Sequence, residues 1–149
     1  MADALVTSTS AVHRSVARLQ LARLCHPASR TVARVELHEF LLHGVRFAFP
    51  PILGAERSGV PTTIAHPELQ TLFTDGVDSK PLVWGSDLGN VCGESIAPLF
   101  PGVPAVAARD ARLHELLAGV DVLRTGSSRE RRIIGEWFGS RILDEQQIS

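Results

Sequence analysis

The sequence predicts an α+β protein, and three observations carry that prediction. Apolar residues recur at helical spacing in residues 9–24, and again near the C-terminus in residues 111–125 and 130–143. Between these regions lie two apolar runs, PLVWGS and NVCGESIA, whose link of turn-forming residues at 87–90 predicts a β-hairpin. The length of 149 residues suits one domain, or one small module fused to another, and allows a core that needs no disulfide.

The N-terminal part predicts two helices and a short pair of strands. Residues 2–6 are expected to form a short helix, and residues 9–24 a longer one with Ser8 as its N-cap, because a serine oxygen accepts from the free amides of the first turn. Pro27 ends helical character, and residues 31–37 contain a strand expected to pair with residues 23–26 across HPAS. The core-facing residues of the longer helix would be Val12, Val16, Leu19 and Leu24.

The middle of the chain predicts loops that alternate with short helices. Residues 36–47 predict a helix that two prolines stop, and residues 52–66 predict a loop with a short extended piece at 62–65. PELQTLF predicts one or two helical turns, whereas the three prolines of PLFPGVPAVAARD predict an irregular surface segment. The buried residues of the helix at 36–47 would be Leu37, Phe40, Leu41 and Val45.

Two longer helices are predicted near the C-terminus. ARLHELLAGVDVLRTG is the clearest, capped by Asp110 and ended by Gly126, and a last helix begins after Ser127 or Ser128 and fades by Leu143. Their apolar stripes should mostly form core, and any excess over what one small domain covers would form a two-fold interface. The stripe residues are Leu113, Leu116, Leu117, Val120, Leu123, Ile133, Ile134, Trp137 and Phe138.

The charges are divided unevenly along the chain. Residues 1–34 hold five arginines against Asp3 alone, a net charge of +4, whereas residues 35–149 hold ten basic and fifteen acidic residues, a net charge of −5. A polyanion should therefore meet the N-terminal end and avoid the remainder. Fourteen of the 15 basic residues are arginine, which suits phosphate and base contacts, although a GC-rich coding sequence explains this bias better.

The stretch ADALVTSTSAVHRSVARL resembles a helix-turn-helix, and the hairpin predicted after it extends the resemblance to the winged helix-turn-helix regulators of bacteria, including those of the MarR kind. The resemblance covers about the first 36 residues, so residues 1–36 are expected to form a partial winged domain that lacks the helix ahead of the pair. In such domains the second helix enters the major groove with its N-terminal residues near the bases. The resemblance implies base contacts by Thr9, Ser10, His13 and Arg14 and a phosphate contact by Arg18. The alternative is a capped surface helix with two solvated arginines.

Residues 37–149 are expected to dimerise, to bind an effector or to contact another protein. The blocks from HEFLLHGVRFAFP to RERRIIGEW are similar to the C-terminal part of bacterial helix-turn-helix regulators without a known ligand. The expected function is transcriptional regulation by sequence-specific binding to double-stranded DNA, by a cytoplasmic homodimer that uses no cofactor or metal. No run approaches the roughly 18 apolar residues of a membrane span, and two cysteines are too few for a disulfide scaffold.

Two other functions stay open at this point. The missing first helix favours a protein-interaction module, either antitoxin-like or an adaptor. GESIA is close to the GxSxG pattern of serine esterases, which would use Ser95 with His114 or His66, but it lacks the final glycine. The six histidines and two cysteines show no zinc spacing, so the histidines are predicted to be ordinary buried or surface residues and both thiols to be buried.

Overall fold

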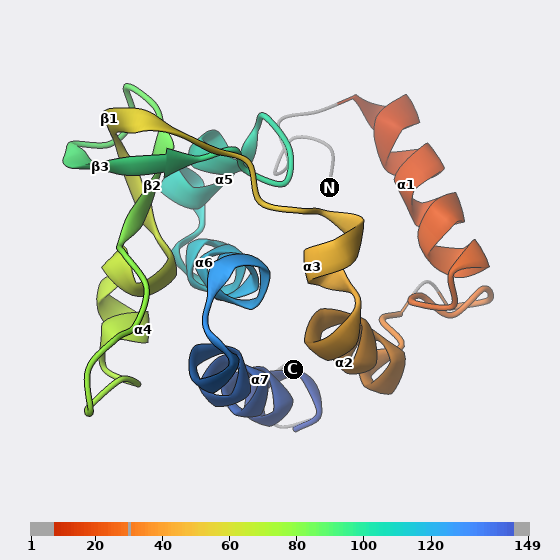
Figure 1. Cartoon of the computed structure of the whole chain (residues 1–149). Helices are drawn as coiled ribbons and strands as arrows, with labels where there is room; N and C mark the ends of the chain where they lie inside the picture. The colour runs from red at the N-terminus through yellow and green to blue at the C-terminus, as the bar shows by residue number, and fades with distance from the viewer. Residues whose placement is uncertain (1–7, 30, 145–149) are drawn as a thin grey trace.

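The computed structural model describes residues 8–29 and 31–144, and these residues form an α+β fold with seven α-helices, one 3-10 helix and three strands. Figure 1 shows α6 in the middle of the molecule, with the strands and α4 on one side and α2 and α3 on the other, while α1 stands apart. The helix expected at residues 2–6 lies outside the described residues. In chain order the elements are α1 (Thr9–Leu21), α2 (Arg34–His43), α3 (Val45–Ala48), β1 (Leu53–Thr62), η1 (Thr63–Ala65), α4 (Pro67–Gln70), β2 (Leu82–Gly85), β3 (Val91–Ile96), α5 (Val103–Arg109), α6 (Ala111–Thr125) and α7 (Ser128–Ile142).

The three strands close on one another as a small barrel. The long strand β1 pairs antiparallel with β2, where Val60 faces Trp84, and its first half pairs antiparallel with β3. Strands β2 and β3 therefore run parallel, with Leu82 beside Glu94. Both apolar runs form strands as predicted, but the antiparallel hairpin between them is wrong, because each run pairs antiparallel with β1 and the two runs pair with each other in parallel.

The loop predicted over residues 52–66 is also wrong. Most of it is β1, and the piece expected to be extended at 62–65 is largely the 3-10 helix η1. The partners of β1 lie 20 to 43 residues further along the chain, so local composition does not reveal them.

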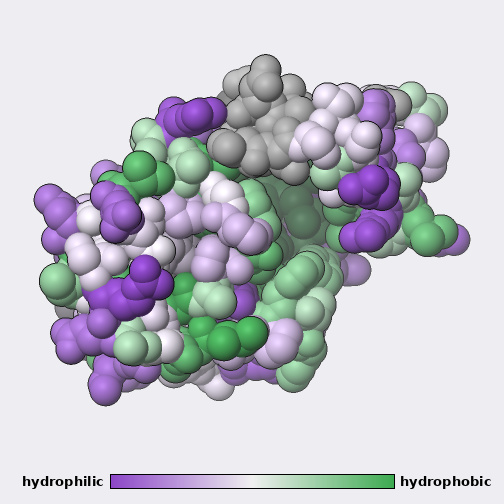
Figure 2. All heavy atoms as spheres, turned by 90° about the horizontal axis from the view of Figure 1, so that it is seen from above, coloured by the Kyte–Doolittle hydropathy of each residue, from purple (hydrophilic) through white to green (hydrophobic). Residues whose placement is uncertain are grey.

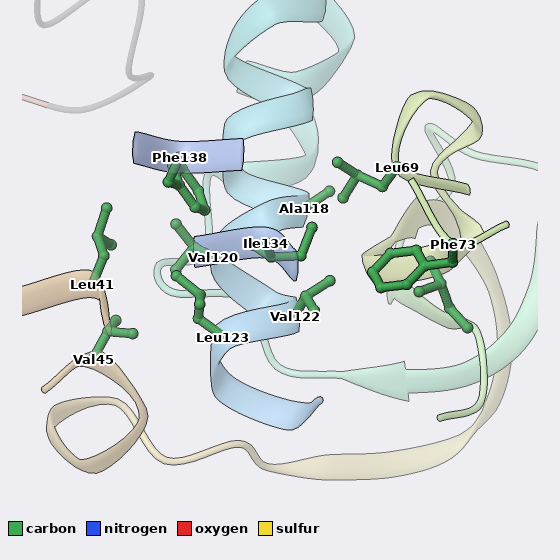
Figure 3. Close-up of a cluster of buried hydrophobic side chains, with 11 residues drawn as sticks. Leu41, Val45, Leu69, Phe73, Ala118, Val120, Val122, Leu123, Ile134 and Phe138 are labelled. Carbon is green, nitrogen blue, oxygen red and sulfur yellow. The ribbon is translucent and has the colours of Figure 1, made fainter. Parts of the chain in front are cut away.

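The main core surrounds α6 (Figure 3). Leu41 and Val45 approach α6 from one side, Leu69 and Phe73 lie on the other, and α7 passes across it. A second cluster joins the strands to α5 and includes Trp84, Ile96 and Val103. Most of the apolar residues of α6 and α7 take part in this packing, as the sequence predicts. The main-core residues from these two helices are Ala118, Val120, Val122, Leu123, Ile134 and Phe138.

The last two helices begin and end where the sequence predicts. The Asp110 side chain accepts a hydrogen bond from the Leu113 amide at 3.0 Å, and Gly126 ends α6. Ser127 and Glu130 form a capping box at the start of α7. Burial opposes ionisation of Glu130, but hydrogen bonds from Ser79 and from backbone amides outweigh it, so the pKa of this carboxyl lies below its ordinary value.

Three other elements differ from expectation. The helix predicted at 36–47 starts at Arg34 and breaks at Gly44 into α2 and α3. Leu41 and Val45 are buried as predicted, whereas Leu37 and Phe40 pack only partly against the core. The segment predicted to be irregular contains α5, because prolines are tolerated in the first turn of a helix, where the missing N–H has no partner.

No helix in the described ranges is long and apolar enough to cross a membrane.

Candidate nucleic-acid interface

Helix α1 begins at the serine cap that the sequence predicts. Oγ of Ser8 accepts a hydrogen bond from the backbone N of Ala11 at 3.1 Å. The first turn has no acidic side chain, so the positive end of the helix dipole is not neutralised there. After the helix, Arg23 adopts a positive φ of 64°, which is uncommon for a residue other than glycine and turns the chain toward the hairpin.

All five residues predicted to contact DNA are exposed on α1. Ser10, Arg14 and Arg18 follow one another at four-residue spacing and therefore share a face of the helix. No residue of α1 is buried, and in Figure 1 the helix projects away from the body and is joined to it through the following hairpin. The structure thus brings together, on one accessible helix, Thr9, Ser10, His13, Arg14 and Arg18.

The opposite face of α1 corrects an expectation. Val12 and Val16 are only half-buried, and Leu19 is 42% exposed. Neither core cluster of the described residues includes a side chain from α1, because the helices that pack around α6 are α2, α3, α4 and α7. The prediction that these residues, with Leu24, form part of a core is therefore wrong.

A short hairpin follows α1, as predicted. Cys25 and Val32 form a single antiparallel bridge, and the backbone N of His26 donates to the carbonyl of Thr31 at 2.8 Å. The side chain of Gln20 donates to the carbonyl of Pro27 at 3.2 Å and so links the helix to the hairpin. The bridging residue Val32 lies within residues 31–37, where the sequence predicts a short strand, and the chain is helical from residue 34 onward.

This end of the molecule is basic. The sequence has no aspartate or glutamate between Asp3 and Glu36. Arg14, Arg18 and Arg23 are all exposed in this interval. An exposed arginine can pair bidentately with phosphate or with the edge of guanine, so the surface has the chemistry that a polyanion needs.

Sequence reasoning missed a buried polar network around Asp121. Its carboxylate accepts hydrogen bonds from Oγ1 of Thr62 at 2.8 Å, from Nε1 of Trp84 at 2.8 Å and from Nη1 of Arg124 at 2.7 Å. Arg124 also donates to the carbonyl of Phe49 at 2.8 Å, so the network ties β1, β2 and the segment after α3 to α6. Two charged residues within the apolar run GVDVLRT are the signal that could have revealed it.

A histidine pair lies beside this network. The rings of His66 and His114 meet edge to face with centroids 4.5 Å apart, and Nε2 of His114 lies 2.7 Å from the carbonyl of Pro61. Nδ1 of His66 accepts from the Glu68 amide at 3.2 Å and caps α4. Burial lowers the pKa of His66, and the neighbouring His114 lowers it further, against a smaller opposing effect of Glu68.

The alternative of a serine hydrolase finds little support in this geometry. Ser95 is buried and donates its hydroxyl proton to the carbonyl of Ala55 at 2.8 Å. Among the described residues no hydrogen bond joins Ser95 to His114 or His66, and both rings are engaged elsewhere. The arrangement of nucleophile and base that this chemistry requires is not formed.

The cysteines and histidines do not gather into a metal centre within the described ranges, where no group of three or more His, Cys, Asp or Glu side chains could hold a metal ion. Cys25 is buried in the hairpin and Cys92 is exposed on β3, so the prediction of two buried thiols is wrong for the second.

Comparison with family models, with curated proteins and with solved structures finds no significant match to this chain.

Proposed function

We propose that the protein is a transcriptional regulator that binds double-stranded DNA sequence-specifically through α1 and the hairpin after it, used as a reduced winged helix-turn-helix. The observation that carries the proposal is the exposure of α1: it buries no side chain and presents two arginines, a histidine and two hydroxyls. A helix with its side chains is about 10–12 Å across, which matches the width of the major groove.

The positions along α1 assign different roles to its residues. Thr9, Ser10, His13 and Arg14 lie in the first half of the helix, where a recognition helix approaches base edges. Arg18 lies one turn beyond Arg14 and suits a phosphate contact. The net charge of −5 over residues 35–149 repels the DNA backbone and so favours an approach by this end.

A homodimer is part of the proposal, because regulators of this type read paired half-sites. An exposed apolar segment after α2 supports it: Phe47 is 71% exposed and Ile52 is 67% exposed. Figure 2 shows hydrophobic surface in the hollow between the end of the molecule that carries α1 and the rest. A mass of twice the chain mass in light scattering would support the dimer. A monomeric mass would contradict it, and the exposed apolar surface would then be a candidate contact for another protein.

The test is DNA binding by the full chain at several salt concentrations, with DNA from upstream of its own operon. Arg14→Ala should weaken specific binding by about 1–3 kcal/mol and relax the sequence preference, because a base contact is lost. Arg18→Ala should weaken binding to all sequences alike and reduce the salt slope by about 1. Arg132→Ala, which removes an exposed arginine from α7, is the matched control. The assignment fails if neither α1 variant differs from this control.

A further inference from the structure

A cavity of about 220 Å³ lies between the hairpin, the start of α2 and the last two helices. Figure 1 shows α2, α6 and α7 converging in this part of the molecule. Apolar side chains form most of its wall, with Val32 from the hairpin, Leu37 from α2, Leu116 from α6 and Ile142 from α7. A cavity of about 150 Å³ already holds a benzene ring, so this one has room for a ring and one small substituent.

Arginines complete the wall of the cavity. Arg34, Arg112 and Arg141 line it from three different helices. Arg141 is held in place, because its Nη2 donates to Glu115 at 2.7 Å and its guanidinium lies 4.4 Å from the centre of the Trp137 ring. Nη1 of Arg34 is different: it is buried and has no hydrogen-bond partner among the described residues. A buried donor without an acceptor is unfavourable, so a ligand that supplies an oxygen anion here is favoured.

We infer that this cavity binds a small aromatic carboxylate, with its ring against the apolar wall and its carboxylate on the guanidinium of Arg34. Because Nη1 is buried, the flexible Arg34 side chain has to rotate toward the cavity to present its planar fork to two carboxylate oxygens. A neutral ligand of the same shape fills the apolar wall but leaves Nη1 of Arg34 without an acceptor. The site therefore selects for charge as well as for size.

The position of the cavity couples it to α1. Val32 is both a wall residue and the partner of Cys25 in the hairpin bridge. The next residue, Ala33, donates its backbone N–H to the carbonyl of Leu24 at 2.9 Å and is the N-cap of α2. A ligand against Val32 would therefore fix the hairpin from which α1 projects. This regulatory consequence rests on the proposed function, whereas the binding of the carboxylate does not.

The test is calorimetric titration of the full chain with benzoate, and with benzyl alcohol as a neutral ligand of similar size. We expect saturable binding of one benzoate per chain, at least about tenfold tighter than that of benzyl alcohol. Arg34→Gln should weaken benzoate binding about tenfold or more and remove the preference for charge. Arg132→Gln is the matched control, because it removes an exposed arginine outside the cavity and should change nothing. Leu116→Trp, which fills the cavity, should abolish binding of both compounds.

Three results would overturn the inference: no saturable benzoate binding up to about 10 mM, equal affinity for the two compounds, or unchanged binding by folded Leu116→Trp protein. Far-ultraviolet circular dichroism verifies that each variant is folded. A DNA-binding measurement with and without benzoate separates the two proposals. If benzoate binds while no DNA is bound, the proposed function fails and the ligand site stands.

Discussion

Asp121 and Arg124 show at the scale of single residues what this fold must satisfy. Both side chains are buried. Asp121 accepts a hydrogen bond from Thr62, and Arg124 donates one to the carbonyl of Phe49, so the two side chains bind different parts of the chain. A charge in such a place is stable only with all of its partners present. The spacing of three residues on α6 was visible in the sequence, but the partners Thr62 and Trp84 were not, because they reach Asp121 only after the strands close.

Removal of Asp121 should be strongly destabilising. Asp121→Ala leaves the guanidinium of Arg124 buried without its carboxylate, and we expect the free energy of unfolding in urea to fall by about 3–5 kcal/mol. Glu136→Ala removes an exposed carboxylate from α7 and should change it by less than about 0.5 kcal/mol. Equal effects of the two substitutions would show that the network does not stabilise the fold.

His66 should make stability depend on pH. Its pKa is lowered in the folded protein, so the unfolded chain binds the proton more tightly. The stabilisation from neutral His66 is complete above the unfolded pKa, about 6.5, and is lost as pH falls from there toward the folded pKa. His66→Asn keeps an acceptor for the cap of α4. It should reduce the change in the free energy of unfolding in urea between about pH 7 and pH 5. Gln70→Asn, which changes an exposed residue without a titratable group on the same helix α4, serves as the control and should leave the dependence unchanged. If the unfolding free energy of the His66→Asn protein depends on pH as strongly as that of the unsubstituted protein, His66 is not the source of the dependence.

At the scale of elements, those with local signals were predictable. The caps at Asp110 and Ser127 and the stop at Gly126 lie within one turn of the helices they delimit, and the structure confirms all three. Strand β1 was not predicted because its partner strands lie far along the chain. Helix α5 was not predicted because prolines usually break helices, although Pro104 lies in the first turn, where a proline is tolerated. For the candidate interface, the five exposed residues of α1 were predictable from its capped amphipathic pattern, whereas the lack of a core behind them depends on where α6 packs.

The crossing of α6 and α7 should depend on a glycine. A Cβ atom built at Gly119 would lie 2.8 Å from Cζ3 of Trp137 and 3.0 Å from the ring of Phe138. Gly119→Val should therefore force the helices apart and lower the unfolding free energy by about 1–3 kcal/mol. Ala111→Val on the exposed first turn of α6 is the control, with an expected change below about 0.5 kcal/mol. A Gly119→Val protein as stable as the control would contradict the close packing described here.

At the scale of the whole molecule, function divides between a body and a projecting end. The body holds both core clusters and the buried network, while α1 buries no side chain and carries Arg14 and Arg18 without an acidic residue. A 13-residue helix without tertiary packing is marginally stable alone in water. Its amides should therefore exchange with solvent much faster than those of α6 until a partner covers it.

The most direct test of the central claim is hydrogen exchange of the full chain, followed by mass spectrometry, with and without DNA from upstream of its own operon. We expect DNA to slow exchange in α1 and in the hairpin at residues 25–32, while α6 and α7 keep their exchange rates. Slower exchange confined to α6 and α7, or no change in α1 under conditions where DNA is bound, would contradict it.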